Sequence, residues 1–388
     1  MRLNLLTTTT IAMLLASSAY AQETIKIGVL TPLSGTYAGI GQQVRWGIDQ
    51  SVEEINAAGG IAGRQIELIY EDSEANPAVA VTKAEKLFTV DNVDFLTGTV
   101  NSGATLAVGQ VADRADKLIA TTVSFSDAIT GSGCSPNVFR VNARAGQQSV
   151  ALAAWLKQEK PGAKVYYLGP DYEMGRSTVA AFKERAESVG ATSTGQVFAP
   201  LDSKDYSQYF GQLRAARPDV LYTSVAGNDT VRLFTQMNDF GVSEGLTILG
   251  ASGTVTAQNI NAIGAAAEGF ITGVGYSVLI DSPENKAFTE AFRERNGADP
   301  DLYGADSYGL LFAYKAAVEA AGATDTDSVR ASLEGLSWET PQGTKTIRAG
   351  DHQAMQPMYV VEVKNGQFTI ARSIAGEDAI GPDTCDKF

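Results

Sequence analysis

One stretch of the sequence, residues 25–87, restricts the fold more than any other part of the chain. Short apolar runs alternate there with longer segments whose apolar residues recur at helical spacing, and glycine or proline marks the boundaries. This alternation predicts a βαβα unit of a doubly wound parallel sheet, which binds ligands at the carboxyl ends of its strands. The elements expected are, in order, a strand at 25–30, a helix with an apolar face at Val44, Ile48, Val52 and Ile55, a stop at Gly59-Gly60, a strand at 66–70 and a helix from Pro77.

The same alternation continues along the chain and predicts an α/β protein with mainly parallel sheets. The run KVYYLGPDYEMG, from Lys164, repeats the strand-and-turn pattern of KIGVLTPLSG near the start, which suggests two similar lobes. Near the C-terminus, Asn365-Gly366 lies between two alternating segments and predicts a β-hairpin. Further strands are expected at 94–98, 117–122, 164–169, 219–225 and 247–250, and helices at 103–114, 147–159, 175–189, 228–240, 283–295 and 306–321.

The first 21 residues have the features of a signal peptide. Arg2 precedes an apolar core, and Ala19-Tyr20-Ala21 is a small-x-small cleavage site. Cleavage after Ala21 predicts export, which in a Gram-negative cell means the periplasm. The residue directly after the cleavage site is Gln22 and not a cysteine, so no lipid anchor is expected. No later segment has the 18 or so apolar residues of a membrane span.

Length and charge narrow the choice of architecture and partner. The chain has 388 residues, which is too long for one compact core and predicts two lobes. Its formal net charge is −14, and loss of Arg2, the only charge in the leader, makes the exported form −15. Such an acidic surface argues against a nucleic-acid partner and against docking on an anionic bilayer.

The chain has two cysteines, Cys134 in the loop TGSGCSPN and Cys385 in the terminal segment GPDTCDKF. An even number of cysteines in an exported chain favours a disulfide. This bond would hold the C-terminal tail against the first lobe.

No motif for catalysis or metal binding is present. The single histidine, His352, lies in the polar segment AGDHQAMQ, is expected to be exposed, and is not preceded by a nucleophile elbow. Phosphate-loop, zinc and calcium patterns are missing as well. Asp171 and Glu173 are expected to be solvated loop residues rather than an acid/base pair. We therefore predict that the protein is not an enzyme and uses no cofactor or metal.

Three segments, PLSGTYAGIG, EINAAGGIAGR and EDSEANPAVAV, occur in order and resemble the opening of the periplasmic leucine/isoleucine/valine-binding proteins. The resemblance continues more weakly through VNSGATLAV, VFRVNARAGQQ, DYEMGRS and RPDVLYTSVAGND, over most of the mature chain. It implies the type I periplasmic binding protein fold, with two doubly wound parallel-sheet lobes joined by three crossing segments. It also implies a monomeric solute receptor of an ABC importer, which closes around a small carboxylate ligand and docks on a membrane permease.

The resemblance places the lobe boundaries as well. Residues 22–142 and 274–350 are expected in lobe 1, and residues 143–273 and 351–377 in lobe 2. Residues 378–388 form the tail that the disulfide would attach to lobe 1.

Several ligand contacts in the first lobe are implied by the family. Ser102 matches a serine that holds the ligand carboxylate, although a helix N-cap is the simpler role for a serine at that position. Phe125 matches a threonine that binds the ligand amine, so Ser124 or Ser126 would have to supply that hydroxyl. Three tyrosines in loops near the cleft complete the set, because each offers a flat apolar face and a hydroxyl: Tyr37, Tyr172 and Tyr303, the last placed before the helix at 306.

Two positions in the second lobe depart from the family. Ala226 replaces a ligand-facing aromatic residue, and Ser252 replaces the glutamate that pairs with the ligand amine. Burying an ammonium group without a carboxylate partner costs several kcal/mol. The sequence therefore favours a small carboxylate without an amine, and an aromatic one fits the room left by Ala226. A branched-chain or other apolar amino acid stays open, as does a periplasmic sensor that presents its ligand to a membrane receptor. Arg45 and Arg144 are expected at the surface.

Overall fold

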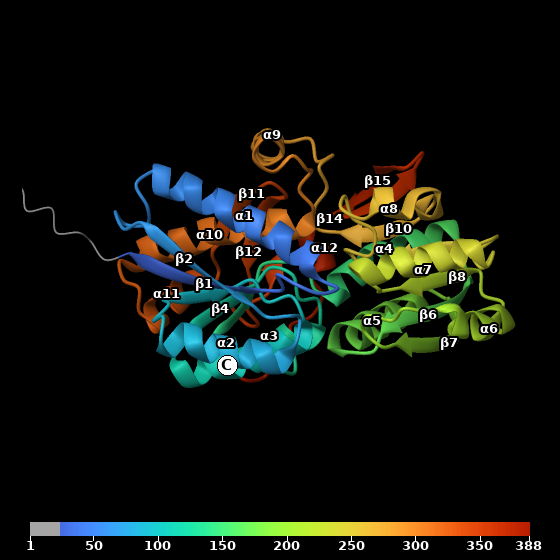
Figure 1. The fold of residues 1–388 in the computed structure, drawn as a ribbon, viewed down its shortest axis with the longest axis horizontal. Helices are drawn as coiled ribbons and strands as arrows, with labels where there is room; N and C mark the ends of the chain where they lie inside the picture. Colours follow the sequence, from blue (N-terminus) through green and yellow to red (C-terminus); the bar gives the residue numbers. More distant parts are fainter. Residues whose placement is uncertain (1–23) are drawn as a thin grey trace, which may run out of the picture.

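The computed structural model describes residues 24–388, so the predicted leader and its cleavage site lie outside the described residues. Two lobes lie side by side in Figure 1, one formed by blue and orange segments and the other by green and yellow segments. The two-lobed α/β architecture expected from the sequence is confirmed. Within residues 24–388, no helix combines the length and apolarity needed to cross a membrane.

The first lobe contains a five-stranded sheet with the strand order β2-β1-β3-β4-β5. Every neighbouring pair is parallel, and the apolar residues of β1 are fully buried on both faces, as a central parallel strand requires. Its strands are β1 (Ile25–Thr31), β2 (Ile66–Asp72), β3 (Phe95–Thr97), β4 (Leu118–Thr121) and β5 (Val138–Arg140). Its helices are α1 (Ala38–Ala57), α2 (Pro77–Thr89), α3 (Ser102–Ala115), η1 (Asp127–Thr130), α9 (Pro283–Asn296), α10 (Leu302–Ala321) and α11 (Thr326–Leu333).

The second lobe contains a seven-stranded sheet with the order β15-β14-β10-β9-β8-β6-β7. Its β6–β10 strands pair in parallel, whereas β14 and β15 form an antiparallel hairpin at one edge. The strands are β6 (Lys164–Pro170), β7 (Thr192–Ala199), β8 (Val220–Thr223), β9 (Thr247–Gly250), β10 (Ile271–Val274), β14 (Met358–Lys364) and β15 (Gln367–Ile374). The helices are α4 (Ala145–Glu159), α5 (Glu173–Ser188), α6 (Ser207–Ala216), α7 (Asn228–Asp239), α8 (Ile260–Ile263), η2 (Gly264–Ala267) and α12 (Gly376–Ala379).

The hairpin predicted at Asn365-Gly366 is confirmed. Both residues have positive φ angles, 54° and 72°, as the tight turn between β14 and β15 requires. A third, antiparallel sheet was not predicted; it consists of β11 (Ser337–Thr340), β12 (Gly343–Ile347) and β13 (Ala354–Met355). This small sheet lies against α10, where the Trp338 indole donates to the carbonyl of Gly309.

The chain passes between the two large sheets three times, after β5, after β10 and before β14. The first and third crossings touch each other, because the amide of Arg140 donates to the carbonyl of His352 at 3.0 Å. The predicted disulfide is also confirmed: Cys134 and Cys385 are bonded across a separation of 251 residues. The C-terminal tail is therefore covalently attached to the loop before β5.

Candidate ligand-binding site

The carboxyl ends of the strands from both lobes face one cleft, and in this structure the lobes are closed on it. The hydroxyl groups of Tyr37 and Tyr172, one from each lobe, are 2.9 Å apart. The Thr36 hydroxyl donates to Asp202 at 2.9 Å, and the Asn228 amide donates to the Thr36 carbonyl at 3.3 Å. The cleft is therefore bridged by direct hydrogen bonds between the lobes.

Two glycines of the second lobe allow this close approach. A Cβ atom at Gly227 would lie 2.9 Å from the ring of Tyr37, and one at Gly253 would lie 1.8 Å from the hydroxyl oxygen of Tyr303. Both glycines also have positive φ angles, which larger residues rarely adopt. Gly227 directly follows Ala226, and Gly253 directly follows Ser252. The sequence analysis did not consider these two glycines, although their position beside predicted site residues could have indicated a close approach of the lobes.

Apolar residues from both lobes belong to one buried cluster. Tyr37, Phe125 and Tyr303 come from the first lobe and Met174 and Ala226 from the second, and all five are at least nine-tenths buried in one cluster. Phe125 and Tyr303 lie with their ring centroids 6.3 Å apart in a stacked arrangement. The half-buried Tyr172 packs against the same cluster. Met174 was not among the predicted site residues. It is 5% exposed and belongs to the same cluster as the predicted residues.

Ser102 and Ser126 lie together at the N-terminus of α3. Ser102 is the first residue of the helix and is fully buried, and its hydroxyl accepts the Ser126 amide at 3.3 Å. The cap itself is Asn101, whose side chain accepts the Ala104 amide, so the simple N-cap role considered for Ser102 is wrong. The helix end offers backbone N–H groups and a partial positive charge, which suit a carboxylate.

Ser124 and Ser252 are buried in the same region, but their hydroxyl groups are bonded within their own lobes. The Ser124 hydroxyl contacts the carbonyls of Thr99 and Val100 at 3.2 and 3.1 Å and lies 2.6 Å from the Thr105 hydroxyl. The Ser252 hydroxyl donates to the Gly273 carbonyl. These two side chains stabilise the strand ends. Their backbones are bonded as well: the Ser252 amide donates to Gln148 at 3.0 Å, and the Ser124 carbonyl accepts from Asn142 at 3.2 Å.

A buried arginine lies behind the loop that carries Ser124 and Ser126. The Arg140 guanidinium donates to the carbonyl of Ser126 at 2.6 Å and to that of Ser124 at 3.3 Å, and its Nε donates to Gln353. Burial lowers the pKa of Arg140 to about 9, so the group stays charged at neutral pH. All its hydrogen-bond partners are neutral, and it therefore makes the loop electrically positive.

Two carboxylates that act on Arg140 through space are bonded directly to other groups. Asp351 forms an ion pair with Arg348, and Asp127 accepts the Gly146 amide at 3.0 Å and lies 3.9 Å from Arg144. Three arginines in this region thus face the carboxylates of Asp351, Asp127 and Glu173, and among the described residues Arg140 itself forms no direct ion pair.

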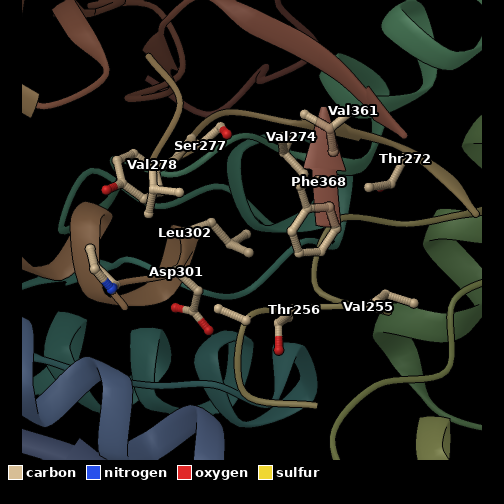
Figure 2. Close-up of a pocket in the computed structure, with 13 residues that line it drawn as sticks. Val255, Thr256, Thr272, Val274, Ser277, Val278, Asp301, Leu302, Val361 and Phe368 are labelled. Atoms are coloured by element: carbon tan, nitrogen blue, oxygen red, sulfur yellow. The ribbon is translucent and has the colours of Figure 1, made fainter. Parts of the chain in front are cut away.

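Two cavities border the cleft at the start of α10. The larger has a volume of about 230 Å³ and lies between the N-terminal ends of α1, α7 and α10 and the loop after β9. Figure 2 shows the smaller one, of about 50 Å³, where Val274, Leu302 and Phe368 provide an apolar wall. Asp301 and Thr256 line both cavities.

Asp301 is a buried carboxylate that the sequence comparison missed. It caps α10 by accepting the amides of Tyr303 and Gly304 at 2.8 and 3.2 Å. Burial raises the pKa of Asp301 to about 7, because the ionised form is costly away from water. Because Asp301 is the cap and α10 begins at Leu302, Tyr303 lies in the first turn of this helix. The prediction that Tyr303 lies in a loop before a helix at 306 is therefore wrong.

Three further sequence predictions are wrong. His352 was expected to be exposed, but it is fully buried and stacks on Phe139 with the ring centroids 4.0 Å apart. Arg144 was expected at the surface, but it is buried and donates to two carbonyls of the C-terminal tail. Glu173 is not a loop residue but begins α5, and it bonds across the cleft to Ser126. In each case the contact comes from a segment that is distant in the sequence: Phe139 for His352, the C-terminal tail for Arg144 and Ser126 for Glu173.

Two surface predictions agree with the structure. Arg45 is exposed and pairs with Asp49 in the next turn of α1, and Asp171 is exposed and pairs with Arg176. Among residues 24–388 there is no group of three side chains suited to hold a metal ion.

The comparisons with known proteins agree with this arrangement. The family model described as "Periplasmic binding protein" matches residues 24–367. The Leu/Ile/Val-binding protein homolog 3 of Brucella melitensis is 28% identical over 335 residues, which cover 85% of this chain and 88% of that protein.

Two solved structures are similar over almost their whole length. A solute-binding protein of an ABC transporter from Rhodopseudomonas palustris HaA2, in complex with p-hydroxybenzoic acid, is 27% identical with a TM-score of 0.84. The match covers 93% of this chain and 98% of that one. Another, from Rhodopseudomonas palustris BisB5 in complex with 3,4-dihydroxy benzoic acid, is 25% identical with a TM-score of 0.84, and covers 91% and 98%.

These relatives are solute-binding proteins, not enzymes, and they imply export to the periplasm, a small-molecule ligand and a membrane permease as partner. The resemblance seen in the first motifs is thus confirmed over the length of both lobes. The chain belongs to the periplasmic binding protein family, in its branched-chain amino-acid group, and is a solute-binding protein of an ABC transporter.

Proposed function

We propose that the ligand of this solute-binding protein is a small aromatic carboxylate without an amino group, held in the cleft by closure of the lobes. The receptor acts as a monomer that is cleaved after Ala21. Its lobes are residues 22–142 with 274–350 and residues 143–273 with 351–377. The proposed contacts are Tyr37, Ser102, Phe125, Ser126, Tyr172, Ala226 and Tyr303, with Ser124 and Ser252 at the strand ends beside them.

The positive end of α3 is the main support for a carboxylate. Ser102 and Ser126 meet there, and the charge of Arg140 lies directly behind the Ser126 carbonyl. Helix amides and a nearby cation both stabilise an anion, and burial strengthens both effects because water does not screen them.

The ring of the ligand is supported by the apolar cluster. Phe125 and Tyr303 already stack on each other, and Ala226 occupies little space between the lobes. Aromatic side chains favour ring contacts of this kind. The two similar solved structures hold hydroxylated benzoic acids, which are carboxylates of the proposed class.

The lack of an amine is supported by Ser252, which stands where an amino-acid receptor would place a carboxylate. Its hydroxyl is already bonded to Gly273, so it leaves an ammonium group without an anionic partner at that strand end. A branched-chain or other apolar amino acid is the second candidate. Asp301 favours it, since this buried carboxylate lines the cleft cavity and would pair with an ammonium group.

A thermal-shift panel on unfolded and refolded protein separates the two candidates. The panel contains leucine, valine, phenylalanine, benzoate, 4-hydroxybenzoate and hydroxycinnamate. A ligand at a thousand times its dissociation constant adds about 4 kcal/mol to the free energy of unfolding. We expect a shift with the amine-free carboxylates only. A shift with leucine or valine alone would overturn the proposal in favour of an amino-acid receptor.

The carboxylate anchor is tested by replacing Ser102 with alanine. We expect Ser102→Ala to weaken the carboxylate found in the panel at least tenfold, equal to about 1.4 kcal/mol, because one buried hydrogen-bond donor is lost. The measurement is isothermal titration calorimetry. Ser207→Ala is the matched control, since Ser207 holds the same first position of α6 in the second lobe. Equal affinities for the two variants would remove Ser102 from the site.

A further inference from the structure

One oxygen of the buried Asp301 carboxylate is not used by the fold. The side chain is 6% exposed, and its Oδ1 atom accepts the amides of Tyr303 and Gly304 at 2.8 and 3.2 Å, which caps α10. No residue in the described part of the chain donates a hydrogen bond to the second oxygen, Oδ2, and none forms an ion pair with Asp301. Burying a carboxylate oxygen without a donor costs free energy, so Oδ2 is an acceptor for a group outside the fold.

The Asp301 carboxylate lines both cavities at the start of α10, and Figure 2 shows it beside Thr256 at the edge of the smaller one. The larger cavity, of about 230 Å³, is also lined by Tyr303, Gly227 and Gly253. The two glycines directly follow two of the predicted ligand contacts. Among the described residues that line this cavity, Asp301 alone carries a charge. The acceptor therefore lies at the border of the proposed ligand site.

A chain of contacts leads from the positive end of α3 to this acceptor. Phe125 directly precedes Ser126, and its ring stacks on that of Tyr303 with the centroids 6.3 Å apart. Tyr303 in turn donates its amide to Asp301. A ligand ring held against Phe125 and Tyr303, with its carboxylate at Ser126, thus has its far edge on the side of Asp301.

We propose that Asp301 is a specificity-determining residue, whose Oδ2 atom accepts a hydrogen bond from a hydroxyl group on the ligand ring opposite the carboxylate. The ligand class is then a hydroxylated aromatic carboxylate rather than benzoate itself. This inference rests on the proposed function, because it requires the carboxylate of an aromatic ligand to bind at α3. A hydrogen bond to an ionised acceptor is roughly twice as strong as a neutral one. A ligand without the hydroxyl leaves the buried oxygen unpaired, which is the basis for rejecting it.

Titration calorimetry of the wild type with benzoate, 4-hydroxybenzoate and 4-methoxybenzoate is the first test. The methoxy compound keeps the ring oxygen but has no proton to donate. We expect 4-hydroxybenzoate to bind roughly tenfold more tightly than either of the others, equal to about 1.4 kcal/mol. Equal affinities for the three compounds would overturn the role of Asp301 and leave the proposed function standing. Binding of none of them would overturn both.

Asp301→Asn is the second test. Asparagine is as good a helix cap as aspartate, so α10 keeps its first turn, but the amide nitrogen donates where the carboxylate accepts. We expect the preference for 4-hydroxybenzoate over 4-methoxybenzoate to fall from roughly tenfold to less than about twofold, because the amide donates to either ring oxygen. The ratio is the readout, since losing a negative charge affects both anions alike. Asp299→Asn is the matched control, because Asp299 is half exposed and pairs with Arg293, and this variant should keep the wild-type ratio.

Two results would overturn the inference. If Asp301→Asn keeps the wild-type preference, Asp301 is only a helix cap. If 4-(aminomethyl)benzoate binds the wild type more tightly than 4-hydroxybenzoate and loses this advantage in Asp301→Asn, the partner of Asp301 is an ammonium group and not a hydroxyl. Circular dichroism establishes that the variant is folded, and if it is not, the wild-type comparison of the hydroxyl and methoxy compounds decides alone.

Discussion

Replacing both cysteines with serine is expected to lower the free energy of unfolding by about 4 kcal/mol. The bonded cysteines, Cys134 and Cys385, are 251 residues apart in the sequence. Closing so long a loop removes much conformational freedom from the unfolded chain. The expected fall in melting temperature is roughly 5 °C for a chain of this size. Differential scanning calorimetry of the double variant against the wild type is the measurement.

The tail would lose more than the covalent bond in this variant. Arg144 donates to the carbonyls of Ile380 and Pro382 at 2.9 and 2.8 Å, and the Phe388 ring lies 4.4 Å from that of His352. These contacts depend on a tail that stays in place. Asp386→Ser is the control, since it changes an exposed tail residue and leaves the disulfide intact. If reduction of the wild type leaves its melting temperature unchanged, the disulfide does not stabilise the fold.

The second large effect is expected at a buried ion pair beside the first crossing segment. Lys345 of β12 and Asp306 of α10 form an ion pair with both side chains nearly fully buried. Lys345 also donates to the Val141 carbonyl at 3.0 Å, and Gln342 donates to Asp306 at 2.8 Å. Burial raises the pKa of Asp306 to about 6 and lowers the pKa of Lys345, so both charged forms depend on this pairing.

We expect Lys345→Met to destabilise the protein by about 3–5 kcal/mol, because it leaves the Asp306 carboxylate buried without a cation. The double variant Lys345→Met/Asp306→Asn should recover most of this loss, since no charge is then buried. Urea denaturation of both variants measures the difference. Lys315→Met is the control, because it removes a half-exposed pair with Glu319 on α10 and should cost less than about 1 kcal/mol. Equal losses for Lys345→Met and Lys315→Met would contradict the expected role of burial.

Much of the fold could be predicted because its signals are local. The apolar face of α1 and the buried strand β1 follow from the spacing of apolar residues within single segments. The hairpin at Asn365-Gly366 follows from two residues that tolerate positive φ. The strands β11 to β13 were missed because they are short and half polar, and they become strands only through pairing with one another and packing on α10.

The site was predicted less completely than the fold. The family resemblance pointed to Phe125 and the choice of loop tyrosines to Tyr37 and Tyr303, and the structure places all three in one buried cluster. The same reasoning said nothing of Arg140 and misjudged Glu173, because their partners are remote in the sequence or belong to the other lobe. Arg140 meets Gln353 across 213 residues, and Glu173 meets Ser126 only because the lobes are closed.

The sequence by itself determined the alternation of strands and helices, the family and the cysteine pair, since each depends on residue type and on spacing along the chain. Only the tertiary structure decided which polar side chains face the cleft. The hydroxyl groups of Ser124 and Ser252 bond within their lobes, whereas that of Ser126 bonds across the cleft to Glu173. The direction of a hydroxyl depends on the nearest acceptor in space, and for a buried serine that acceptor comes from another segment.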